Sequence, residues 1–169
     1  VPLTNSDGHW LENVHAPSVA RVWSAYSEKE YVESSNMGGQ YWVELSDGTF
    51  QKSGKPYHGA TGYSHLDLYA FGLIPPEEVK DTFYLENLQL VSGDRYRAKK
   101  VPLRIQDIIH AQGARAPASA AAPKEFSLRV YLFHRDAQPR HLARARSAAA
   151  AVRRHYGLAS GGRWKLTAE

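Results

Sequence analysis

The sequence contains no cysteine among its 169 residues. Disulfide bonds, thiolate nucleophiles and cysteine metal sites are therefore excluded. Long apolar runs are missing too, since none approaches the roughly 20 residues that a bilayer-spanning helix needs. Residues 1–5 carry neither the basic stretch nor the apolar core of a signal peptide. We expect a mature or excised fragment with no membrane partner.

Three common catalytic and binding motifs are also absent. No histidine is followed by glutamate, so the sequence has no His-Glu-x-x-His helix, the element that carries two zinc ligands and the general base of many peptidases. There is no Gly-x-Ser-x-Gly turn of a serine hydrolase and no glycine-rich phosphate loop. Ser46-Asp47-Gly48 lacks the further acidic residues of a calcium loop, so we assign it to a hairpin turn.

The charge is modest and uneven. The formal net charge is +4, and arginine is concentrated in the last third of the chain. Nucleic-acid binding would need these arginines on one helix face beside aromatic or amide side chains that read bases, whereas we expect them to spread around a solvated helix, so nucleic acid is not expected as a partner. The arginines in question are Arg129, Arg135, Arg140, Arg144, Arg146, Arg153, Arg154 and Arg163.

Residue patterns predict several strands and helices. Strand formers and turn residues predict a hairpin over residues 40–52 and two strands over residues 82–91 and 95–105, joined by residues 92–94. A further strand is predicted over residues 126–134. Helices are predicted from the Ser64 cap to Gly72, over residues 106–112 up to Gly113, and over residues 139–156 up to Gly157. Residues 1–36 are expected to be loop with short helical pieces, one beginning near Pro17.

The last helix carries an apolar stripe that we expect to be buried, so that aspartate at Leu142 or Val152 would unfold the domain. The stripe comprises Leu142, Ala145, Ala149, Val152 and Tyr156. Together the elements predict one α+β domain over residues 1–169, with a small antiparallel sheet and three or four helices.

The spacing of the histidine, acidic and aromatic residues does not by itself indicate a catalytic or metal site. The eight histidines form no metal-ligand pattern, and a lone histidine is usually structural. Asp67, Glu77, Glu78 and Glu86 are conceivable paired carboxylates, but charge at a helix start explains Glu77 and Glu78 more simply. Aromatic residues between positions 23 and 71 either line a cleft or form the core of a small sheet, and the core is the safer interpretation.

Three short segments carry the most specific pattern. They are Gly8-His9-Trp10, Ser35-Asn36-Met37-Gly38-Gly39, and residues 63–79, Tyr-Ser-His-Leu-Asp-Leu-Tyr-Ala-Phe-Gly-Leu-Ile-Pro-Pro-Glu-Glu-Val. In this order they resemble a family of secreted bacterial proteins in which the third stretch follows a zinc-peptidase helix. The downstream segments at residues 105–109, 113–117 and 124–126 look similar as well. More distantly, the order is similar to that of leishmanolysin-type metzincins.

The resemblance implies a role for each segment. His9 would be the third zinc ligand, Met37 would be the methionine of the Met-turn, and Tyr63 or His65 would face the cleft. Residues 1–80 would form the metal-ligand and Met-turn segment, and residues 81–169 a strand-helix-strand-helix segment. His9 and Met37 should then lie close together, beside a cleft walled by residues 63–73.

The leading hypothesis is therefore the C-terminal subdomain of a secreted or periplasmic zinc endopeptidase that acts on a peptide or protein substrate. Because catalytic zinc takes three protein ligands and an open position, zinc is expected only with ligands from a missing segment, which a separate N-terminal chain would be one way to supply. The alternative is a non-catalytic binding or self-assembling module of a secreted bacterial protein.

We predict that this chain alone has no peptidase activity, because it lacks the general base and two of the three zinc ligands. Incubation of the purified chain with casein should release no fragments. Cleavage that a chelator abolishes would contradict the prediction.

Overall fold

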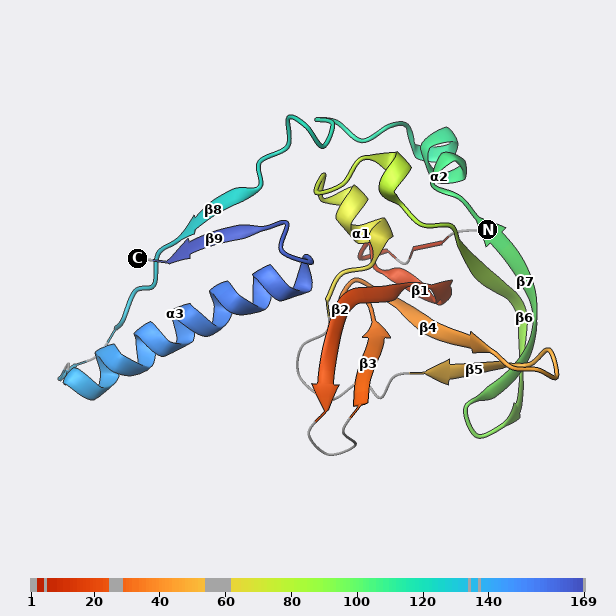
Figure 1. Cartoon of the computed structure of the whole chain (residues 1–169), viewed down its shortest axis with the longest axis horizontal. Coiled ribbons are helices and arrows are strands. Elements are labelled where there is room, and N and C mark those ends of the chain that lie inside the picture. The colour runs from red at the N-terminus through yellow and green to blue at the C-terminus, as the bar shows by residue number, and fades with distance from the viewer. Residues whose placement is uncertain are drawn as a thin grey trace.

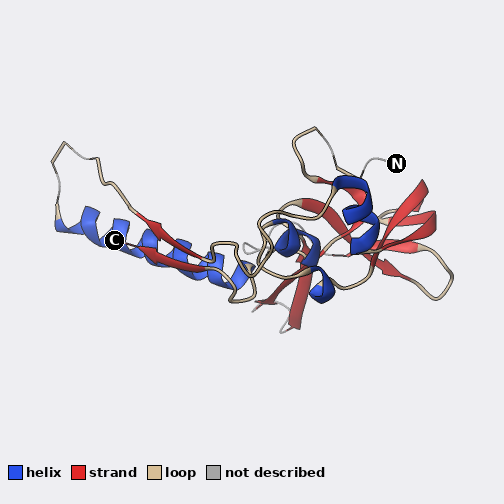
Figure 2. Ribbon diagram, turned by 90° about the horizontal axis from the view of Figure 1, so that it is seen from above, coloured by secondary structure: helices blue, strands red, loops and turns tan. Residues whose placement is uncertain are grey.

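A computed structural model describes residues 3–4, 6–24, 29–53, 62–133, 135–136 and 138–168. Figure 1 shows a strand-rich body from which an arm projects, and Figure 2 shows the same division from above. The arm contains the last long helix and two short strands. The predicted mixture of helices with a mostly antiparallel sheet is confirmed, with three α-helices among the described residues.

The body is built on a closed five-stranded barrel with the strand order β1-β4-β5-β7-β6. β1 runs parallel to β4, and the other neighbouring pairs are antiparallel. Both predicted hairpins are confirmed. Asp47 shapes the first turn, because its carboxylate accepts hydrogen bonds from the Thr49 amide and hydroxyl. The strands are β1 (Trp10–His15), β4 (Gly38–Glu44), β5 (Phe50–Ser53), β6 (Thr82–Ser92) and β7 (Arg95–Leu103).

The expectation of loop and helix over residues 1–36 is wrong. Besides β1, this region forms a separate hairpin of β2 (Pro17–Ser24) and β3 (Lys29–Ser34). Pro17 stands at the first position of a strand, which tolerates a missing N–H as well as the first turn of a helix does. The β-branched and aromatic residues that follow favour the strand.

Helices α1 (His65–Ala70) and α2 (Ile105–Gln112) begin and end close to the predicted positions. Gly113 ends α2 with a φ of 84°, a conformation that suits glycine. Glu77 and Glu78 lie in the short 3-10 helix η1 (Pro76–Glu78). No helix among the described residues is long and apolar enough to cross a membrane.

The largest hydrophobic cluster joins α1 to one side of the barrel. Leu68 and Ile74 are almost completely buried there, together with Val14 from β1. A smaller cluster of Trp42, Phe50 and Leu85 fills another part of the barrel. The body therefore has two apolar clusters, and the larger one holds α1 in place.

The arm is a β-α-β unit formed by β8 (Glu125–Leu128), α3 (Pro139–Ala159) and β9 (Lys165–Ala168). β8 and β9 pair in parallel, which requires a crossover such as α3. β8 is shorter than predicted, β9 was not predicted, and Gly157 lies inside α3 instead of ending it.

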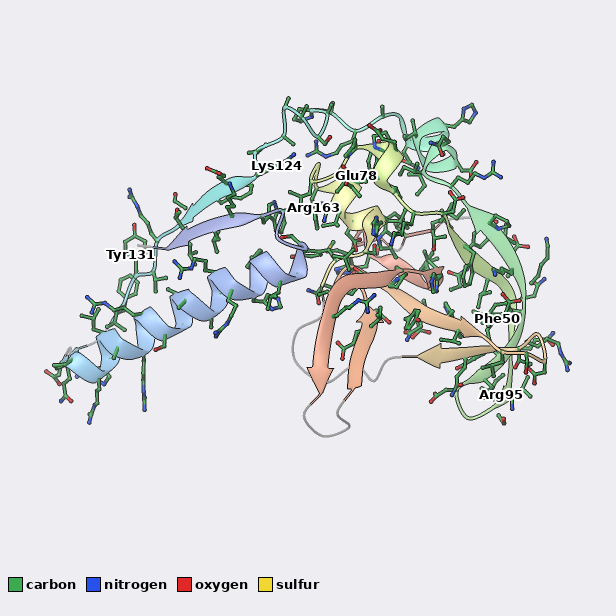
Figure 3. All side chains as sticks on the ribbon, viewed as in Figure 1. Phe50, Glu78, Arg95, Lys124, Tyr131 and Arg163 are labelled. Carbon is green, nitrogen blue, oxygen red and sulfur yellow. The ribbon has the colours of Figure 1, made fainter. Side chains whose placement is uncertain are left out.

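Aromatic side chains join the arm to the body. Trp164 stacks on Phe71 at 5.2 Å and meets Tyr63 edge-on at 5.4 Å. Figure 3 shows Arg163 and Glu78 on the two sides of this junction, where their ion pair measures 3.2 Å. The junction is therefore apolar at its centre and charged at its edge.

The apolar stripe of α3 is not buried as predicted. Leu142 is 46% exposed and Val152 is 37% exposed, because only the narrow β8–β9 ribbon covers this side of the helix. An aspartate at either position would remain largely hydrated. The expected unfolding of the whole domain does not follow from this geometry.

His15, at the end of β1, is a half-buried histidine of the barrel. Its ring stacks on Phe83 at 4.4 Å, and its Nδ1 accepts a hydrogen bond from the Trp42 amide at 3.1 Å. Burial, followed by the positive charge of Lys100, lowers the pKa of His15 to about 4. Protonation of Nδ1 would remove the acceptor that the Trp42 amide uses.

We predict that His15 makes the fold sensitive to acid. Its folded-state pKa of about 4 lies below the ordinary value of 6.5, so the unfolded chain binds a proton first as the pH falls. The free energy of unfolding should therefore decrease between these two values. Urea denaturation across this interval should show a shallower decrease for His15→Gln than for the unmodified chain. The exposed control His110→Gln should keep the original decrease, and an unchanged slope in His15→Gln would contradict the prediction.

Candidate functional site

The three segments of the sequence pattern converge on Asp67, the third residue of α1. Its side chain is 2% exposed. One carboxylate oxygen, Oδ1, accepts a hydrogen bond from the Trp10 indole at 2.6 Å. The other, Oδ2, accepts from the Ser35 hydroxyl and from the Ser64 amide and hydroxyl, the latter two at 2.6 and 2.7 Å. One buried carboxylate thus joins the segments at residues 8–10, 35–39 and 63–79.

Local helix chemistry explains why Asp67 stands there. Ser64 is the N-cap of α1, and its hydroxyl also accepts from the Asp67 amide at 3.3 Å, which completes a capping box. The sequence signal for this was the Ser-x-x-Asp spacing. Asp67 is therefore explained as a structural acceptor, and the idea that it pairs with another carboxylate for catalysis has no support in these contacts.

Ser35 extends the hydrogen bonding to the turn that contains Met37. Its hydroxyl accepts from the Met37 amide at 3.0 Å while it donates to Asp67. Gly38 follows with a φ of 87°, and a Cβ atom there would lie 2.5 Å from the Trp10 carbonyl oxygen. The close approach of β1 to this turn therefore requires glycine at position 38.

His9 lies directly beside this turn. The Trp10 amide donates to the Met37 carbonyl at 2.8 Å. A Cβ atom on Gly38 would be 3.3 Å from the Cβ of His9, and the His9 side chain is exposed. The two segments are thus in contact through their backbone, while the expected place of the Met37 side chain beneath the His9 ring stays a prediction. A metal role for His9 and a supporting role for Met37 stay predictions.

Tyr63 and His65, the two candidate cleft residues, have local packing partners. Besides Trp164, the Tyr63 ring contacts Phe71 edge-on at 5.0 Å, and burial is the main cause of the raised pKa of its hydroxyl. His65 is half-buried, with Nδ1 2.9 Å from the Glu78 carbonyl oxygen. Burial is also the main cause of the lowered pKa of His65. These contacts account for both side chains without a ligand.

A hollow of about 410 Å³ adjoins Trp10 on the side of α2. Its walls combine apolar side chains with a few polar ones, a composition typical of small-molecule and peptide sites. The expected cleft wall at residues 63–73 does not contribute to it. The lining residues are Leu3, Thr4, Trp10, Leu103, Asp107, Ile108, Ala111 and Gln112.

Zinc has no complete set of ligands in the described part of the chain. No group of three or more histidine, cysteine, aspartate or glutamate residues suited to a metal ion occurs there. His58 and His134 lie outside the described residues. A single imidazole from His9 does not hold a catalytic zinc ion, so the residues described here do not fit zinc by themselves.

Comparison with known proteins adds no assignment: no family model, curated protein or solved structure matches the chain. The interpretation of the site therefore depends on its geometry and on the resemblance in sequence.

We predict that Asp67→Asn lowers the free energy of unfolding by about 2–4 kcal/mol, because an amide removes the charge and turns an N–H₂ group toward the surrounding donors. The matched control is Asp107→Asn, which changes the corresponding residue in the exposed capping box of α2. Urea denaturation should show a much smaller loss for the control. Equal losses in the two variants would contradict a central role for Asp67.

Proposed function

We propose that this chain forms the C-terminal subdomain of a secreted or periplasmic zinc endopeptidase, to which His9 contributes one zinc ligand. The observation that carries the proposal is the direct contact between the His9-Trp10 segment and the Met37-Gly38 turn. The resemblance requires this contact between two segments that are far apart in the sequence. A fold in which the two segments lay on opposite sides would have removed the argument.

The surroundings of His9 support a ligand role because they restrain its backbone. The neighbouring Trp10 is held by its indole on Asp67 and by its amide on the Met37 carbonyl. A metal ligand gains from such restraint, since less freedom is lost when the metal binds. Because the His9 side chain is exposed, ligands from another segment could approach it and share one zinc ion with it.

The remaining ligands and the general base have to come from residues outside the described ones. A preceding segment of the same polypeptide or a separate N-terminal chain would supply them, and Met37 would support the site from below. The substrate class implied is a peptide or protein. In such enzymes zinc activates the water that attacks the peptide bond.

The second candidate function is a non-catalytic binding or self-assembling module. It is favoured by the arm, where neighbouring large apolar side chains are exposed, among them Tyr131, Leu132 and Phe133. Soluble proteins seldom leave contiguous apolar surface uncovered unless it binds something. This candidate requires neither zinc nor a role for His9.

A zinc measurement on the complete gene product distinguishes the two candidates. We predict that the purified protein retains zinc after dialysis, and that His9→Ala lowers both its zinc content and its chelator-sensitive peptidase activity by tenfold or more, a change on the order of 1.4 kcal/mol. His110→Ala, which removes an exposed histidine of α2, is the matched control and should change neither quantity. Full zinc content in His9→Ala would contradict the proposal, and a zinc-free, correctly folded gene product would favour the binding module.

A further inference from the structure

Positive charge is concentrated in the arm. Residues 124–169 contain ten lysine and arginine residues against three acidic residues, whereas residues 1–123 contain eleven against fourteen. The arm segment is thus formally +7 and the rest of the chain −3, which together give the net +4. Such segregation indicates an anionic partner for the arm.

The arginines of α3 are ordered relative to its apolar stripe. The helix carries five arginines and no acidic residue. With about 3.6 residues per turn, Arg140, Arg144 and Arg154 fall on the side opposite the stripe. Arg146 and Arg153 flank the stripe and line a hollow beside Val130 and Leu132. The arginines therefore occupy the side opposite the stripe and one flank of it, and the stripe itself contains none.

The free end of the arm is strongly apolar. Tyr131 is 70% exposed and Phe133 is 91% exposed, and their rings stack with centroids 6.5 Å apart. Leu132 and Leu142 beside them are almost half exposed. Figure 3 shows Tyr131 at the end of the arm remote from the barrel. Arg129, Arg135 and Arg140 surround this tip in the sequence.

We propose that the arm docks on a bilayer surface rich in anionic phospholipid. Tyr131 and Phe133 would enter the interfacial region, and the arginines of α3 and of the tip would contact lipid phosphates. Basic residues attract a protein to anionic lipid, while apolar side chains set how firmly it stays. The proposal is independent of zinc and replaces the expectation that the chain has no membrane partner.

Two other partners, nucleic acid and a second copy of the arm, fit the same surface less well. Nucleic acid would use the arginines and stack on the aromatic rings, but the aliphatic Leu132 and Leu142 have no stacking role. A second copy of the arm would bring the same positive charge against this one, so charge repulsion disfavours the self-assembling form of the second candidate at this surface. A bilayer surface accommodates both the charge and the aliphatic side chains.

The chain offers an internal control at the opposite end of the molecule. Leu90 is 65% exposed at the end of β6, beside Val91, which is 48% exposed. This region is apolar, and the surrounding residues 82–103 carry four basic against two acidic residues, a smaller positive excess than the +7 of the arm. If exposed apolar residues alone were sufficient, both ends would bind lipid equally.

The absence of cysteine allows a direct test with one label per molecule. An environment-sensitive fluorophore would be attached to Phe133→Cys, or to Leu90→Cys as the control. We expect vesicles of phosphatidylcholine with roughly 30% phosphatidylglycerol to increase emission at position 133 and leave position 90 unchanged. Pure phosphatidylcholine vesicles should change neither. No response at position 133, or equal responses at both positions, would overturn the proposal.

Cosedimentation of the unlabelled chain with the same vesicles separates charge from apolar contact. We expect Arg140→Ala/Arg144→Ala, and separately Tyr131→Ser/Phe133→Ser, to weaken binding roughly tenfold or more. Lys80→Ala/Arg97→Ala, which removes the same charge from the body, should retain binding within about twofold. Circular dichroism should show that all variants are folded. Binding to single-stranded DNA that survives the tip variant, without binding to vesicles, would assign the arm to nucleic acid and overturn the membrane proposal.

Discussion

The hydrogen bonds to the buried Asp67 carboxylate join three segments that also meet through the pairing of β1 with β4 and through backbone hydrogen bonds. The start of β1, the turn before β4 and the cap of α1 each give it at least one donor. A carboxylate is suited to this position because it accepts several hydrogen bonds without supplying a donor of its own. A buried charge without these partners would be strongly destabilising, so the arrangement is satisfied only when all three segments are in place. The position of His9 follows from this constraint.

The arm depends on a different kind of interaction. Its own β-α-β unit buries little apolar surface, and its firmest attachment is the aromatic cluster of Trp164, Tyr63 and Phe71. The Tyr63 amide also donates to the Ala159 carbonyl at 2.9 Å. Because α1 is adjacent to both the Asp67 contacts and this cluster, the same short helix orients the zinc-ligand candidate and the arm.

Local chemistry in the sequence was sufficient to predict the hairpins, α1 and α2, because turn residues and caps act over a few positions. It was insufficient for β2 and β3, where Pro17 fits two kinds of element, and for β9, a short strand whose partner is forty positions away. Within the site, the pattern anticipated that His9 and Met37 would be neighbours. Asp67 was considered only as one of several conceivable paired carboxylates, since a link between distant segments requires knowledge of which of them meet.

The closure of the barrel by β1 has a consequence for the order in which the chain folds. β1 is made well before β6, yet the two strands are partners: Val14 pairs with Tyr84, and the Asn13 side chain donates to the Leu85 carbonyl. The ribosome must therefore synthesise the chain through β6 before β1 can pair along both of its edges, with β4 and with β6. Contacts of such long sequence separation slow folding. Until they form, the edges of β1 and β6 are unpaired and open to pairing with other chains.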